Sequence, residues 1–173
     1  MNPVSIRASR LFAVLLASLA ASGVADALVV RHDVADAAYL ARESEFPAVF
    51  SLYRTRAGHP DCLATLIAPR HALTAAHCTG VEKLRAAIDA GTGFRVDIAG
   101  RADSIVAVFV PPLRADGSSP DVAILQLGSP VDGIEPIAPH AMSDEVGRIV
   151  LMPGWGGTGT GKTGAGASDG FFR

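Results

Sequence analysis

Two side chains in the middle of the sequence could carry acid–base chemistry, namely His77 and Asp121. An imidazole exchanges a proton near neutral pH, which suits it to take the proton of a hydroxyl group. A carboxylate can accept the other N–H of that imidazole, which fixes its tautomer and stabilises its charged form. By residue type alone, however, a histidine beside a cysteine is more often structural, and an aspartate before a strand is usually a turn residue. The surrounding sequence must therefore decide their role.

A different candidate site lies near the end of the sequence, where residues 156–163 fit the phosphate-binding pattern G-x-x-x-x-G-K-[ST]. Such a loop needs a helix directly after its Lys-Thr pair, because the N-terminus of that helix binds the phosphate. Residues 164–170 read Gly-Ala-Gly-Ala-Ser-Asp-Gly, a composition that does not hold a helix. We therefore predict no nucleotide binding here. We also expect no other cofactor and no metal, because the remaining histidines show no ligand spacing: His32, His59, His71 and His140.

The elements around the two candidates are short and strand-like. Apolar runs alternate with proline and glycine turn signals from residue 47 onward, and residues 94–98 alternate apolar and polar side chains as a half-buried strand does. His77 follows one such run, and Asp121 directly precedes another. Several short strands at near-regular spacing predict an all-β domain, either an antiparallel barrel or a sandwich. Further strand candidates lie at residues 84–88 and 149–152.

The overall composition excludes several classes of protein. The chain has 173 residues, enough for one compact domain or two small ones. Its formal net charge of -2 gives no electrostatic footprint for DNA or RNA, so we expect no nucleic-acid partner. The 18 glycines and 11 prolines disfavour a bundle of long helices. The two cysteines allow at most one internal disulfide.

Residues 1–27 are typical of a secretory signal peptide. Arg7 and Arg10 precede the apolar stretch 11–21, which is too short to span a bilayer. Residues 25–27, Ala-Asp-Ala, then offer the small-x-small pattern of a cleavage site. An uncleaved anchor is the alternative, but no second apolar block extends the run. We therefore expect a secreted or periplasmic protein with no membrane association after cleavage, in a compartment where a disulfide persists.

Three sequence elements, in the same order, resemble the chymotrypsin/trypsin-like serine proteases. Residues 73–78, Leu-Thr-Ala-Ala-His-Cys, resemble the catalytic-histidine motif of that family. Residues 121–127, Asp-Val-Ala-Ile-Leu-Gln-Leu, resemble its catalytic-aspartate strand. Residues 154–156, Gly-Trp-Gly, are similar to an element early in the second barrel of the family.

This resemblance implies a trypsin-like antiparallel six-stranded β-barrel, with a second barrel that is truncated. It divides the chain into the signal peptide 1–27, the first barrel 28–128, and a linker with the incomplete start of the second barrel 129–173. It implies that His77 is the general base and Asp121 its orienting carboxylate. It further implies a disulfide between Cys62 and Cys78, for which free thiols or a metal site are the alternatives.

The nucleophile of that family is missing from this sequence. Its serine lies in a Gly-Asp-Ser-Gly-Gly motif that does not occur here, and residues 168–170, Ser-Asp-Gly, lack the glycines that build an oxyanion hole. No Ile-Val-Gly-Gly start follows residue 27, so activation by N-terminal insertion is not expected. We expect a secreted serine endopeptidase acting on protein or peptide substrates, truncated before its nucleophile and inactive alone. The alternative is a non-catalytic homologue that acts as a binding module, which has no chemical use for the His–Asp pair.

Overall fold

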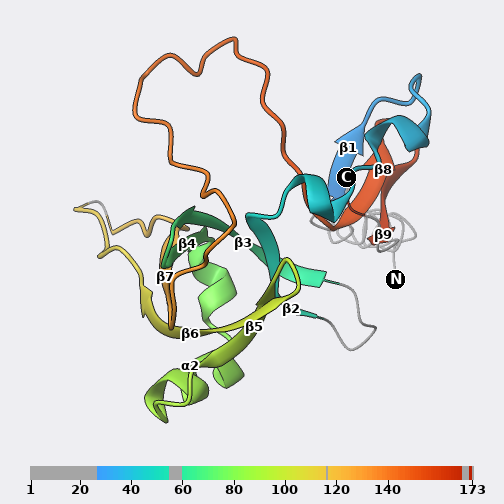
Figure 1. Cartoon of the computed structure of the whole chain (residues 1–173). Coiled ribbons are helices and arrows are strands. Elements are labelled where there is room, and N and C mark those ends of the chain that lie inside the picture. The colour runs from blue at the N-terminus through green and yellow to red at the C-terminus, as the bar shows by residue number, and fades with distance from the viewer. Residues whose placement is uncertain (1–26, 55–59, 116, 169–171, 173) are drawn as a thin grey trace, which may run out of the picture.

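The main body of the molecule is an antiparallel β-barrel. The computed structural model describes residues 27–54, 60–115, 117–168 and 172. The barrel strands are β2 (Val49–Arg54), β3 (Pro60–Ala68), β4 (His71–Thr74), β5 (Phe94–Ile98), β6 (Arg101–Phe109) and β7 (Ala123–Leu127). They form one six-stranded sheet in the order β2-β3-β4-β7-β6-β5, and its outer strands β2 and β5 contact each other (Figure 1). The sheet therefore curls into a nearly closed barrel, and the predicted fold class is confirmed.

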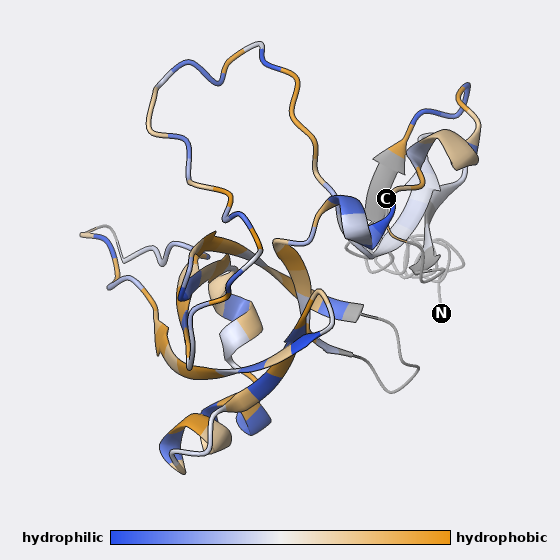
Figure 2. Cartoon of the chain, viewed as in Figure 1, coloured by the Kyte–Doolittle hydropathy of each residue, from blue (hydrophilic) through white to orange (hydrophobic). Residues whose placement is uncertain are grey.

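Alternating side chains fill the interior of the barrel. In β7, Ala123, Leu125 and Leu127 are buried while Ile124 between them is exposed. The period-two pattern predicted for residues 94–98 is also confirmed, because Val96 and Ile98 point inward and their charged neighbours outward. Figure 2 shows the apolar stretches along the barrel strands. Each fully buried aliphatic side chain contributes about 1.5–3 kcal/mol to folding. The core therefore fixes the strands in place, and with them the turns at the strand ends.

Two predicted strands are absent from the structure. Residues 84–88 lie instead in the helix α2 (Glu82–Asp89), because Leu84 and Ile88 are four residues apart and both pack against the barrel core. The residues between them favour a helix, and only a short apolar spacing suggested a strand. Residues 149–152 form no strand, because no described strand pairs with them and their side chains are largely exposed.

A second, smaller sheet contains β1 (Ala27–Val30), β8 (Gly157–Thr160) and β9 (Gly164–Ser168). β1 runs parallel to β8, and β8 and β9 form an antiparallel pair joined by a turn at Gly161–Thr163. A strand thus follows Lys162 and Thr163 at the place where a phosphate-binding loop requires the N-terminus of a helix. The glycine-rich segment is a β-hairpin and lacks the geometry of that loop.

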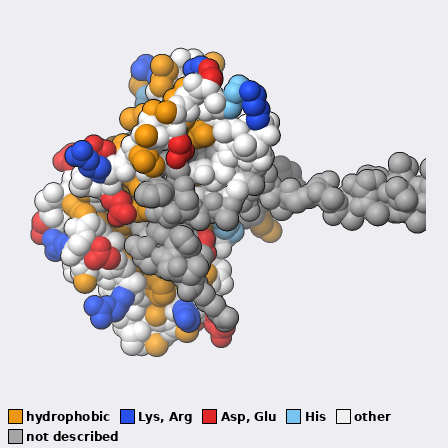
Figure 3. Space-filling model, turned by 90° about the vertical axis from the view of Figure 1, so that its right-hand side faces the viewer, with side chains coloured by type: hydrophobic (Ala, Val, Ile, Leu, Met, Phe, Trp, Pro, Cys, Tyr) orange, Lys and Arg blue, Asp and Glu red, His pale blue; other side chains and the backbone are white. Residues whose placement is uncertain are grey.

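The rest of the described chain carries short helical turns and long connections. The turns are η1 (Asp36–Tyr39) and η2 (Glu43–Glu45) before the barrel and η3 (Ala76–Thr79) after β4. Basic and acidic side chains are interspersed on the face seen in Figure 3. No helix among the described residues is long and apolar enough to cross a membrane. Residues 1–26 of the predicted signal peptide lie outside the described residues.

A hydrogen bond from a buried threonine ties the end of β4 to β3. Thr74 is buried, and its Oγ1 donates to the carbonyl oxygen of Leu63 at 2.6 Å. Replacing Thr74 by valine leaves that carbonyl without this donor, so we expect the free energy of unfolding to fall by about 1 kcal/mol. Urea unfolding measures the loss.

The matched control for this prediction is Thr92→Val. It removes a bond from Thr92 Oγ1 to the carbonyl of Ala87, at 3.1 Å and at an exposed site where water replaces the lost partner. Its loss should therefore be smaller. Equal losses in the two variants would show that burial of the Thr74 bond does not matter.

Candidate active site

The turn η3 presents His77 to solvent while it anchors the next residue in the core. The His77 side chain is 69% exposed, whereas Cys78 is only 4% exposed. The turn closes with backbone hydrogen bonds from Cys78 N–H to the carbonyl of Ala75 and from Gly80 N–H to that of His77. Buried Thr79 adds a bond from its Oγ1 to the carbonyl of Ala76 at 2.8 Å. The histidine is thus exposed on a rigid support.

The sheet register brings Asp121 to the same place. Strands β4 and β7 are antiparallel neighbours, with Thr74 opposite Ala123. The end of β4 therefore meets the beginning of β7, so the residue three positions after Thr74 lies near the residue two positions before Ala123. The structure accordingly places His77 and Asp121 in contact, although 44 positions separate them in the sequence.

Both carboxylate oxygens of Asp121 bind the same residue. Asp121 Oδ2 lies 2.7 Å from Nδ1 of the His77 ring, and Oδ1 accepts the backbone N–H of His77 at 2.9 Å. The carboxylate therefore fixes the orientation of the ring and the position of its backbone together. A ring that donates from Nδ1 leaves Nε2 unprotonated, able to accept a proton from a hydroxyl.

The same contacts determine the charge state of Asp121. Hydrogen bonds from His77 hold the pKa of the Asp121 carboxyl below its ordinary value, first the backbone N–H and then the side chain. The carboxyl is therefore ionised throughout the neutral range. Since both side chains are more than half exposed, the contact adds little to stability, as is usual for surface ion pairs.

This lowered pKa gives a pH-dependent prediction. A carboxyl whose pKa falls on folding stabilises the protein above its unfolded value of about 4, and this contribution is lost as the pH falls through the lower folded value. We expect wild type to unfold at a higher temperature than Asp121→Asn at pH 5, with a smaller difference at pH 3. Thermal unfolding of both proteins at both pH values measures this difference in unfolding temperature. A difference of the same size at pH 3 and pH 5 would contradict the lowered pKa of Asp121.

The predicted disulfide between Cys62 and Cys78 is present. It joins the beginning of β3 to the turn η3, with a Cα–Cα distance of 5.8 Å. Cys62 has a φ of 46°, a left-handed conformation uncommon for residues other than glycine. Potential ligand atoms of Cys62, His77 and Cys78 lie within 4.8 Å of one another. Because the two sulfurs are bonded to each other, they offer no thiolates, and this cluster is not a metal site in the oxidised protein.

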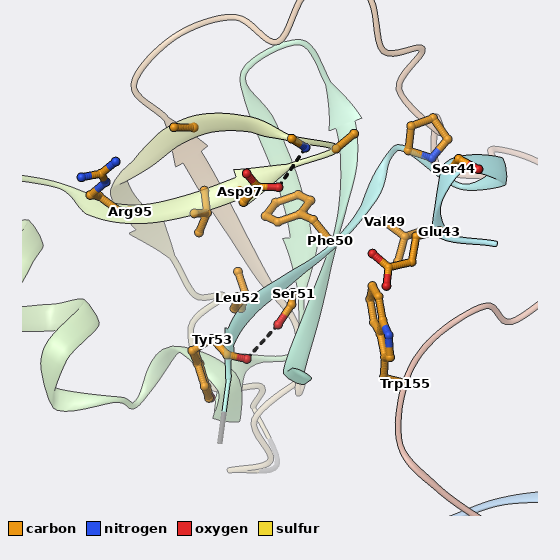
Figure 4. Close-up of a pocket in the computed structure, with 15 residues that line it drawn as sticks. Glu43, Ser44, Val49, Phe50, Ser51, Leu52, Tyr53, Arg95, Asp97 and Trp155 are labelled. Atoms are coloured by element: carbon orange, nitrogen blue, oxygen red, sulfur yellow. Dashed lines mark hydrogen bonds between the residues drawn. The ribbon is translucent and has the colours of Figure 1, made fainter. Parts of the chain in front are cut away.

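The third motif contributes Trp155 to a cavity on the described part of the chain. Trp155 is half-buried, and its ring centroid lies 4.6 Å from that of Phe172. It lines a cavity of about 600 Å³ together with Glu43, β2 and the turn between β5 and β6 (Figure 4). Neither His77 nor Asp121 lines this cavity.

Sequence reasoning did not single out one polar residue at the site. The hydroxyl group of Tyr53, on β2, donates to the carbonyl oxygen of Cys78 at 3.3 Å. No spacing rule connects residues that are 25 positions apart on different elements. Only the pairing of β2 with β3, combined with the disulfide, could have suggested that they meet.

A nearly closed six-stranded barrel with a histidine–aspartate pair at the strand ends defines a trypsin-like β-barrel protein. A family model described as Trypsin matches residues 38–168, and the chain therefore belongs to the trypsin family. Comparison with curated proteins finds no match. Membership of this family indicates a serine-peptidase lineage and, in general, peptide substrates.

Proposed function

We propose that this chain supplies the general base and its orienting carboxylate to a secreted serine endopeptidase, His77 and Asp121 respectively. The nucleophilic serine of that enzyme lies outside these 173 residues, because the sequence contains no Gly-Asp-Ser-Gly-Gly motif. The observation that carries the proposal is the double contact of one carboxylate with the ring and backbone of one exposed histidine.

The proposed reaction proceeds through an acyl-enzyme. Nε2 of His77 takes the proton of the serine hydroxyl as its oxygen attacks the peptide carbonyl, and the imidazolium then gives this proton to the leaving amine. A water molecule, activated in the same way, releases the acyl group. Asp121 stays ionised throughout and stabilises the imidazolium. The N–H groups of the oxyanion hole would come from the polypeptide that carries the serine.

The contact favours catalysis over the alternative of a pure binding module. An exposed pair contributes little to stability, so folding alone does not account for two hydrogen bonds that one carboxylate accepts from one histidine. In an enzyme this geometry has a use, because it selects the tautomer whose Nε2 can accept a proton. This geometry supports the proposal that His77 accepts the proton while Asp121 holds its ring in place.

The proposed location outside the cytoplasm rests on two features. One is the signal-like composition of residues 1–27, and the other is the disulfide between Cys62 and Cys78. Disulfides persist mainly in oxidising compartments, such as the periplasm and the extracellular medium. The two features agree, because one would direct the chain to the compartment that the other requires.

Reading the genomic DNA past the codon for Arg173 tests the proposal. An in-frame or frame-shifted continuation that encodes Gly-Asp-Ser-Gly-Gly is the expected result. A stop codon followed by unrelated DNA would contradict it and favour the binding module. The 173-residue chain alone should not hydrolyse an activated peptide ester, because it lacks the nucleophile.

A further inference from the structure

The turn that carries His77 is held from three directions. Asp121 accepts its backbone N–H, and the disulfide from Cys62 fixes the Sγ of Cys78. A further polar contact comes from Tyr53, whose hydroxyl donates to the main-chain carbonyl of Cys78. Cys78 is thus held by its side chain and by its main chain, directly beside the candidate base.

The two anchors of Cys78 come from neighbouring positions of one β-ladder. Tyr53 lies opposite Asp61 in the pairing of β2 with β3, and Asp61 directly precedes Cys62. The Tyr53 ring is half-buried and packs against the barrel core, which leaves the hydroxyl little freedom to move. The barrel wall therefore sets the position of the turn through a rigid side chain and a covalent bridge.

The Tyr53 hydroxyl is suited to remain a donor. Burial first, and then the negative charge of Asp61, raise the pKa of Tyr53 above its ordinary value. The phenol therefore keeps its proton at every pH at which a neutral or mildly alkaline protease would work. Loss of this proton would place a phenolate against a carbonyl oxygen, which repels it.

We propose that Tyr53 is a positioning residue, whose hydroxyl holds the turn η3 so that His77 stays in register with Asp121. The consequence for catalysis rests on the proposed function, whereas the positioning itself is a property of the folded chain. Tyr53 acts through its hydrogen bond to Cys78 and is itself neither the base nor the orienting carboxylate.

The test compares Tyr53→Phe with Tyr39→Phe. The first variant removes only the hydroxyl and keeps the packed ring. The second removes the other tyrosine hydroxyl of the chain, which accepts the backbone N–H of Arg31 at 3.1 Å, well before the barrel in the sequence. Two readouts are measured by NMR on the folded chain, namely hydrogen exchange at the His77 amide and the pKa of the Asp121 carboxyl.

We expect Tyr53→Phe to speed exchange at the His77 amide by roughly threefold to tenfold, as loss of one hydrogen bond permits. We also expect it to raise the pKa of Asp121 towards its ordinary value, because the hydrogen bonds from His77 lower it. Tyr39→Phe should change neither quantity.

An unchanged Asp121 pKa in Tyr53→Phe would overturn the proposal. Faster exchange at all barrel amides together, without that pKa change, would also overturn it, since it would show a purely structural role. Neither readout uses catalysis. Failure of the proposed function would give a different result. No serine would react in the enzyme, although Tyr53→Phe would still change the two readouts as expected.

Discussion

Replacing Asp121 by asparagine lowers kcat for peptide-ester hydrolysis by about 10⁴-fold, measured on an enzyme form that includes the serine missing from residues 1–173. The asparagine amide keeps the shape of the side chain but presents an N–H₂ group where a carboxylate oxygen met Nδ1 of His77. The ring then adopts the tautomer with the proton on Nε2, which cannot accept the proton of the serine. His77→Ala should be at least as damaging, because it removes the base itself.

The matched control is Asp144→Asn. The Asp144 carboxylate also contacts a histidine ring, with its Oδ1 at 2.6 Å from Nε2 of His140, in the connection between β7 and β8. This second pair has no part in the proposed reaction, so kcat should stay within about twofold of wild type. If Asp121→Asn kept a tenth of wild-type kcat, or if both variants lost activity equally, the assignment of the base would be wrong.

Removal of the disulfide is the second large effect. We expect Cys62→Ser together with Cys78→Ser to lower the free energy of unfolding by about 3 kcal/mol in the chain-entropy model, because the bridge closes a loop across 16 positions. The loss is large for one small barrel, whose total stability is of the order of 5–15 kcal/mol. Urea unfolding under oxidising conditions measures it.

A reducing agent provides the control for this second prediction. Reduced wild type should unfold at nearly the same urea concentration as the double variant, and the double variant should not respond to the reducing agent. Because Cys78 is the neighbour of His77, the double variant should also show faster exchange at the amides of the turn η3. A double variant as stable as oxidised wild type would show that the bridge does not constrain the unfolded chain.

The barrel could be predicted because its signals are local and repeated. Residues 94–98 show period-two alternation, and the run after Asp121 ends at a clear turn signal in residues 128–130. The resemblance of residues 73–78 and 121–127 to known motifs then predicted that His77 and Asp121 act as a pair, but it gave no order for the strands. The disulfide followed from the same resemblance, and the structure contains it.

The structure differs from the sequence-based expectation where local sequence signals are ambiguous or absent. The apolar residues of 84–88 fit either a short strand or one face of a helix, and packing of Leu84 on the barrel selects the helix. The parallel pairing of β1 with β8 joins segments from opposite ends of the chain, which no local pattern can predict. The hydrogen bond from Tyr53 to Cys78 depends on the closed barrel in the same way. The roles of His77 and Asp121 and the secretion of the protein stay predictions.

Covalent labelling tests the central claim most directly. A serine-directed phosphonylating reagent is added to an enzyme form that continues beyond Arg173 through its serine, and the modified peptide is identified by mass spectrometry. The account predicts a single adduct, on the serine of a Gly-Asp-Ser-Gly-Gly sequence, which forms in wild type and fails to form in His77→Ala. An adduct that forms equally fast without His77, or no adduct in a folded wild-type enzyme, would contradict it.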